Sequence, residues 1–110
     1  MDNNLFIFMG EEQIAEFDRS RGLAGRQRQA LDALDSDMDQ GIDLDGERVE
    51  HPDRMQRIQF VMRHLFHAIE RDDEGVAALM CAYIATRLPD LRAIRATEEG
   101  DQVRARLEFN

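Results

Sequence analysis

Apolar residues recur at helical spacing through the middle of the chain. In the segment from Ala24 to Met38 one face is formed at spacings of three and four by Gln27, Ala30, Leu31, Leu34 and Met38. Between Pro52 and Asp72 apolar residues form a broad stripe on one side of a helical wheel. The stripe of the second segment consists of Met55, Ile58, Val61, Met62, Leu65, Phe66 and Ile69. The pattern predicts helices over both segments, the second opened by Pro52 and Asp53 at positions that favour a helix start.

The next segment, residues 73–88, is apolar on nearly every side and ends at Pro89. Such a helix is expected at the centre of a fold or beneath a second subunit. Its cysteine, Cys81, is the single cysteine of the chain, so no internal disulfide can form. The apolar surroundings predict a buried, unreactive thiol.

A further helix is expected from Gly10 to Arg21. Glu11 and Glu12 stand where the N-terminal dipole favours acids, and Gly22 follows as a stop. Ile14 and Phe17 would give this helix an apolar face. The sequence thus contains about four helical segments.

The two ends of the chain favour strands. The run Leu5–Met9 is rich in β-formers, although periodicity leaves open whether it forms a strand or leads into a helix. Near the other end, apolar and charged residues alternate from Val103 to Phe109, which predicts a half-buried strand of a hairpin that turns near Gly100. A loop or very small hairpin is expected over residues 41–50, with a tight turn at Asp45-Gly46.

We therefore expect an α+β fold that is mainly helical. It would hold about four helices and a small antiparallel sheet made by the C-terminal hairpin, with or without the N-terminal strand. A chain of 110 residues has the usual size of one domain, so residues 1–110 are predicted to form a single domain.

The formal net charge is −9, and all 14 basic residues are arginine. The absence of lysine is typical of a GC-rich bacterial genome. An acidic chain repels the phosphate backbone, so nucleic acid is not expected as a partner. No segment resembles a signal peptide or a membrane span, and the lack of disulfides suits a reducing compartment. We expect a cytoplasmic protein that does not bind membranes.

Acidic residues are concentrated between Asp32 and Asp53, where nine carboxylates accompany one arginine. Part of this stretch resembles the start of a calcium loop, with candidate oxygen ligands at Asp35, Asp37, Asp39, Asp43 and Glu47. Gln40 stands where such loops need glycine, and Gly46 stands where they need glutamate. The alternative is a solvated acidic surface. Calcium or magnesium is accordingly the one cofactor hypothesis, beside the expectation of none.

Phe60 falls on the polar side of its predicted helix, close to His64 and His67 and next to Arg63. Either another part of the chain covers this ring, or Phe60, Arg63, His64 and His67 form a surface for a protein partner or a second copy. No motif commits the chain to a reaction, and no catalytic residue can be named. The favoured function is a non-enzymatic interaction or regulatory protein that self-associates. A divalent-cation-binding domain using the acidic residues is the alternative, and a small enzyme is the second alternative.

Overall fold

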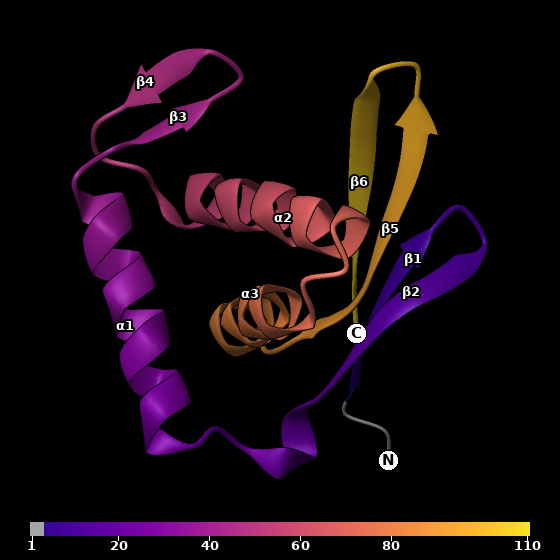
Figure 1. The fold of residues 1–110 in the computed structure, drawn as a ribbon, viewed down its shortest axis with the longest axis horizontal. Helices are drawn as coiled ribbons and strands as arrows, with labels where there is room; N and C mark the ends of the chain where they lie inside the picture. Colours follow the sequence, from indigo (N-terminus) through magenta and orange to yellow (C-terminus); the bar gives the residue numbers. More distant parts are fainter. Residues whose placement is uncertain (1–3) are drawn as a thin grey trace. The chain divides into compact units, whose positions relative to one another are not determined.

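The computed structural model describes residues 4–110, and within them the fold is α+β with three α-helices and six strands (Figure 1). The helices are α1 (Gly25–Asp39), α2 (Arg54–Glu70) and α3 (Glu74–Arg87). The strands are β1 (Asn4–Met9), β2 (Glu12–Asp18), β3 (Ile42–Leu44), β4 (Glu47–Val49), β5 (Leu91–Glu99) and β6 (Gln102–Phe109). The expectation of a mainly helical protein with four helices is therefore wrong.

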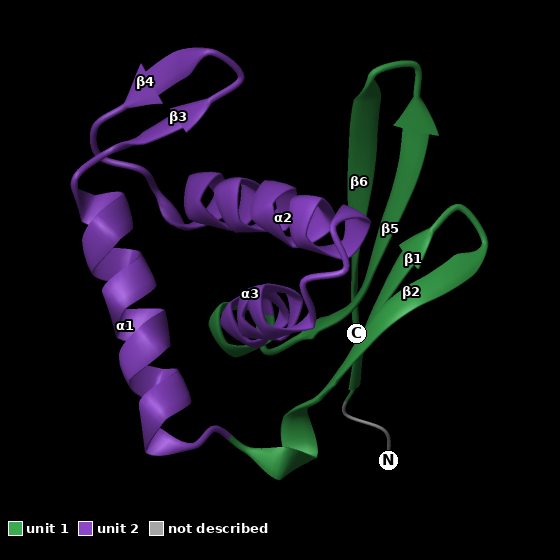
Figure 2. Ribbon diagram, viewed as in Figure 1, with its two compact units in different colours: residues 1–22, 85–110 green, residues 23–84 purple. Residues whose placement is uncertain are grey.

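The chain divides into two compact units (Figure 2). One unit consists of residues 1–22 and 85–110 and contains a sheet, whereas residues 23–84 form a mainly helical unit. The boundary falls inside α3, whose last residues, from Ala85, belong to the sheet unit. Whether the whole chain behaves as a single domain stays a prediction.

The sheet unit holds four strands in the order β2-β1-β5-β6. The pairs β1–β2 and β5–β6 are antiparallel, but β1 runs parallel to β5. The sheet is thus mixed, not purely antiparallel as expected. Its centre is formed by the two strands that carry the most buried residues, with Leu5 and Ile7 on β1 and Ile94 and Ala96 on β5.

The predicted helix over Gly10–Arg21 is a strand followed by one short 3₁₀ turn, Arg19–Arg21. Strand β2 returns from β1 through a two-residue turn at Gly10 and Glu11, and Gly10 has φ +62°. Glycine at the first position of a two-residue loop is a β-hairpin signal, because this turn needs a positive φ there. Pairing with β1 outweighs the helical spacing of Ile14 and Phe17, since two apolar residues do not define a period.

The C-terminal hairpin is present as predicted, with its turn at Gly100 and Asp101. However, the apolar row on β6 is not the buried face that the alternation predicted. Val103, Ala105 and Phe109 are exposed, and Leu107 is half-buried. Strand β6 lies at the edge of the sheet, whereas its partner β5 lies inside it.

In the helical unit, α2 begins two residues after the predicted start at Pro52, because Asp53 is its N-cap. The Asp53 carboxylate accepts a hydrogen bond from the Gln56 backbone N–H at 2.8 Å, and the Gln56 side chain accepts one from the Asp53 N–H at 2.9 Å. This reciprocal capping box satisfies donors that a helix start leaves open. The apolar stripe predicted for this helix is largely buried, including Ile58 and Leu65.

Residues 41–50 form a small hairpin of β3 and β4. Its turn residues Asp45 and Gly46 have φ +51° and +82°, as a two-residue turn with two left-handed positions requires. The hairpin presents Ile42 and Leu44 to the interior and Asp43 to solvent. Among the described residues, no helix is long and apolar enough to cross a membrane.

Candidate functional site

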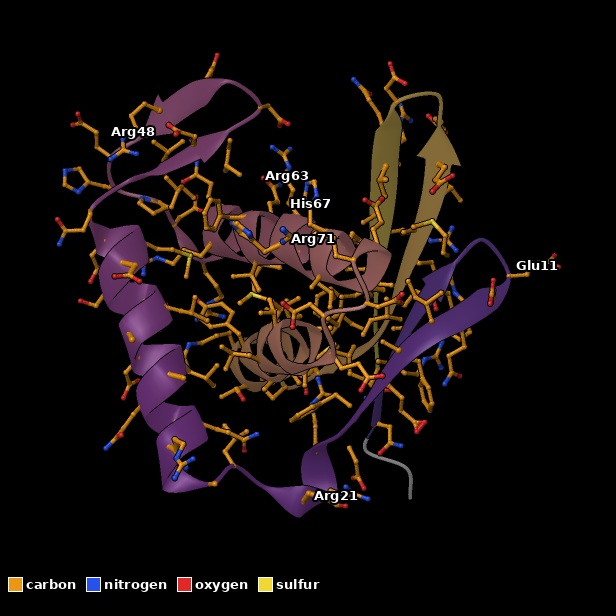
Figure 3. All side chains as sticks on the ribbon, viewed as in Figure 1. Glu11, Arg21, Arg48, Arg63, His67 and Arg71 are labelled. Carbon is orange, nitrogen blue, oxygen red and sulfur yellow. The ribbon has the colours of Figure 1, made fainter. Side chains whose placement is uncertain are left out.

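The candidate surface predicted from the sequence lies on α2. We call Phe60, Arg63, His64 and His67 the α2 surface. The three polar residues are exposed, and Phe60 is half-buried. Figure 3 shows the side chains of Arg63 and His67 on one side of α2, and Arg71 follows as the residue that caps the C-terminal end of this helix. The helical repeat alone gives this arrangement, because residues three or four positions apart share a face.

Phe60 and His64 are in direct contact. Their ring centroids lie 4.5 Å apart with an interplanar angle of 69°, which is an edge-to-face arrangement. Such aromatic pairs contribute about 0.5–1.5 kcal/mol beyond the burial of their area. The pair therefore holds an aromatic group at the surface in a defined orientation.

The electrostatic setting of the α2 surface is cationic. Partial burial lowers the pKa of His64, and the nearby His67, Arg63 and Arg71 lower it further. The neutral imidazole is thereby favoured near neutral pH, and it can both donate and accept a hydrogen bond. An acidic group brought close to His64 would oppose the effect of the three cationic neighbours.

Arg63 is already engaged within the helical unit. Its guanidinium forms an ion pair with the Asp45 carboxylate at the tip of the β3–β4 hairpin. Both side chains are largely exposed, so the ion pair contributes little to stability. Its consequence is positional, since the pair orients the arginine at one end of the α2 surface.

The acidic residues proposed as cation ligands are placed differently from a calcium loop. Asp35, Asp37 and Asp39 all lie within α1, where Asp35 and Asp39, four positions apart, share one face and Asp37 points to another side. A calcium loop instead wraps its ligands around one centre. Among residues 4–110, the structure brings no three histidine, cysteine or acidic side chains together as metal ligands would be.

Arg57 of α2 contacts two of these candidate ligands at the end of α1. Its guanidinium lies 3.3 Å from Asp35 Oδ1 and 2.5 Å from Asp39 Oδ1. It also donates to the backbone carbonyl oxygens of Asp35, at 3.1 Å, and Pro52, at 3.2 Å. Carboxylates near a helix C-terminus repel the dipole, and this arginine offsets that cost. No local sequence pattern predicts the ion pairs of Arg57, because they join residues that are 18 and 22 positions apart in the chain.

The remaining candidate ligands are dispersed. Asp37, Asp43 and Glu47 are exposed, and Asp43 lies 3.7 Å from the guanidinium of Arg48. Arg48 also donates to the Gln40 carbonyl oxygen at 2.9 Å, which places it over the end of α1. Cation binding by this stretch stays a prediction, and the geometry gives it no specific support.

A second charged group that the sequence did not single out lies on the sheet. Glu108 of β6 is surrounded by three arginines, with Arg95 Nε at 2.9 Å, Arg106 Nη2 at 3.2 Å and Arg92 Nη2 at 3.7 Å. The hydrogen bond and charge of Arg95, with the charges of Arg106 and Arg92, lower the pKa of Glu108. The alternating residues of β6 were the available signal, because they place Arg106 and Glu108 on one face.

The chain matches no protein-family model, no curated protein and no solved structure at a significant level.

Proposed function

We propose that this chain is a non-enzymatic interaction or regulatory protein that self-associates and binds an acidic segment of a protein partner through the α2 surface. One observation carries the proposal: the Phe60–His64 edge-to-face pair at the surface of α2, flanked by Arg63 and His67. Aromatic and arginine side chains are enriched in protein interfaces, where they act as anchors.

Charge supports an acidic partner. The α2 surface contains two histidines and one arginine, and Arg71 adds a further cation near His64, although Arg63 pairs with Asp45 and the chain as a whole carries a net charge of −9. Complementary charge raises association rates and selects among partners. A partner carboxylate near His64 would also favour the protonated imidazole, so binding would strengthen as the pH falls towards the lowered pKa of His64.

Comparative capture of partners tests the proposal. The wild-type chain, Phe60→Glu and the matched control Gln59→Glu would each be used to recover proteins from the source cells. Gln59 is exposed and adjacent on α2, so the control adds the same charge outside the α2 surface. We expect a partner recovered by the wild type and the control but lost with Phe60→Glu. Equal recovery by all three would contradict the proposal.

The folded state of Phe60→Glu must be checked by circular dichroism and thermal unfolding. A folded variant with lost binding identifies an interface residue. An unfolded one would place Phe60 in the core, and His67→Glu, at an exposed position, then tests the same surface.

Self-association is tested by size-exclusion chromatography with light scattering. We expect the apparent mass to rise from 12.7 kDa towards twice that value as concentration increases. A strict monomer at high micromolar concentration would contradict this part of the proposal.

The two alternatives remain expectations, since no contact favours either one. Titration of calcium or magnesium, followed by amide shifts in residues 35–50, tests the cation-binding domain. A small enzyme would require a substrate pocket that holds His64 or His67 beside a carboxylate.

A further inference from the structure

Strand β6 combines a free edge with an exposed apolar row. It pairs with β5 on one side, and no described strand pairs with its other side. It is eight residues long and contains no proline, so its outer backbone groups are able to pair with another strand. The side chains of Val103 and Phe109 are 41% and 50% exposed, and they lie on the same face as the buried Ile94 and Ala96 of β5.

Proteins commonly protect such an edge with charges or a bulge. Strand β6 carries Arg104, Arg106 and Glu108 on the other face, and its register with β5 is regular from Gln102 to Glu108. The effect of these charges on pairing with another strand depends on the residues that face them on that strand. Like charges directly opposite each other destabilise the pairing, whereas opposite charges stabilise it.

A second copy of the chain presents the same strand. An isologous pairing of two β6 strands is antiparallel about a two-fold axis perpendicular to the sheet, so it keeps the two faces matched. Three registers overlap by at least seven of the residues from 102 to 110, with centres at Ala105, Arg106 and Leu107. They differ in the charge pairs that they create across the axis.

Centring on Ala105 places Arg104 opposite Arg106 of the second copy, twice. Centring on Arg106 places Arg104 opposite Glu108 of the second copy, twice, but it also places Arg106 opposite itself, which is a like-charge pair at the axis. Centring on Leu107 places Arg106 opposite Glu108 of the second copy, twice, with no like-charge pair. In this last register Leu107 also faces itself, and the small Ala105 faces the large Phe109.

We propose that two copies of this chain pair through β6 in an antiparallel register centred on Leu107, which joins their sheets into one continuous eight-stranded sheet. This inference rests on the self-association proposed above and names the strand that mediates it. The matching of Arg106 with Glu108 adds a contact from the second copy to those that Glu108 makes with Arg95 and Arg106 of its own chain. This matching, together with that of Ala105 with Phe109, is the complementarity that selects a second copy of the chain as the occupant of this edge. The α2 surface is not used by this pairing.

Two charge-reversal variants of the full chain test the register. Each variant loses one ion pair within its own chain, Arg106 with Glu108 and Arg104 with Glu99. Arg106→Glu also places a carboxylate opposite Glu108 of the other copy at two positions, and it is expected to weaken association at least about tenfold, because two favourable pairs become repulsive. Arg104→Glu makes the same charge change on the same face, but in the proposed register it faces Asn110. Sedimentation equilibrium should therefore give an association constant close to that of the wild type for Arg104→Glu.

The outcomes separate this inference from the self-association itself. A dimer that Arg106→Glu leaves intact would overturn pairing through β6 but retain a self-associating protein. Loss of the dimer by Arg104→Glu would overturn the register, because Arg104 faces Glu108 of the second copy only in the pairing centred on Arg106. A wild-type chain that stays monomeric would overturn both proposals. Circular dichroism should show both variants folded, because both arginines are exposed.

Cysteine cross-linking gives a second measurement that does not depend on charge. Leu107→Cys places two thiols opposite each other at the axis, where mild oxidation should give a covalent dimer. Val103→Cys, on the same face of the same strand, has no counterpart within the paired residues and should remain monomeric after oxidation. The native Cys81 is buried and does not compete. Cross-linking at position 103 but not at position 107 would overturn the proposal.

Discussion

The hydroxyl of Tyr83 in α3 donates a hydrogen bond to Asp35 Oδ1 in α1 at 2.5 Å. The same carboxylate accepts from Arg57 of α2, so one acidic residue joins the three helices of the helical unit. Tyr83 is 1% exposed, which makes this a polar contact between an interior side chain and a half-buried one.

Tyr83→Phe should lower the free energy of unfolding by about 1.5–3 kcal/mol, the usual contribution of a hydrogen bond to a charged acceptor. The ring stays in place, and Arg57 still neutralises Asp35, so no buried charge is left uncompensated. Urea unfolding would show a lower midpoint with an unchanged slope. As a control, Asp37→Asn removes a carboxylate from an exposed position of α1 and should have little effect. Equal effects of the two changes would contradict the role assigned to the hydrogen bond.

In the helical unit, the features that the sequence predicts are those set by residues close together in the chain. Helices α1, α2 and α3 were predicted close to their observed bounds, because each has either a long apolar period or strong end signals such as Asp53 and Pro89. The cluster of Asp35, Arg57 and Tyr83 was not predicted. It brings together residues up to 48 positions apart, and no local pattern encodes such a contact.

Strand β2 and the exposed row of β6 show the same limit in the sheet. Local spacing favoured a helix at Ile14 and Phe17, and pairing with β1 decided otherwise. Alternation correctly gave a strand from Val103 to Phe109, but alternation does not tell whether other elements cover its apolar side. The α2 surface needed only the helical repeat, so its members could be named in advance, whereas the arginines around Glu108 needed the strand register.

Arg57→Gln should destabilise the chain by about 2 kcal/mol, because the guanidinium makes charge-assisted hydrogen bonds to both Asp35 and Asp39. Hydrogen bonding to Asp39 is the main reason that the pKa of Arg57 is raised, so this arginine remains charged throughout the accessible pH range. Arg54→Gln, at an exposed position in the same helical turn, provides the matched control. Chemical denaturation of both variants gives the comparison, and similar midpoints would refute the role of Arg57.

Cys81 should resist modification in the folded protein. Burial raises the pKa of its thiol to about 12, so almost no thiolate exists at pH 8. Reaction with a disulfide reagent should therefore be slow under native conditions and fast in guanidinium chloride, where the pKa returns towards its ordinary value. The ratio of the two rates, measured by absorbance, checks this. A native rate close to the unfolded rate would show that the thiol is accessible.

The α2 surface should respond to pH through His64. Its pKa is lowered by burial, and then by His67, Arg63 and Arg71, so the folded state favours the neutral ring. The unfolded chain takes up the proton first as the pH falls. Stability linked to His64 is therefore complete above about pH 6.5 and declines as the pH falls through the interval down to the folded pKa. Ring-proton NMR should give His64 a lower titration midpoint than a free histidine.

Arg71→Gln removes one of the cations near His64 and should raise this midpoint towards the ordinary value. Arg54→Gln makes the same change at the opposite end of α2 and should leave the midpoint unchanged, since charge effects fall with distance and are screened by salt. If both variants gave the wild-type midpoint, burial alone would explain the low pKa, and the cationic character assigned to the α2 surface would lose its support. A midpoint that rises only with Arg71→Gln would mean that the charge on α2 sets the protonation of the residue packed against Phe60.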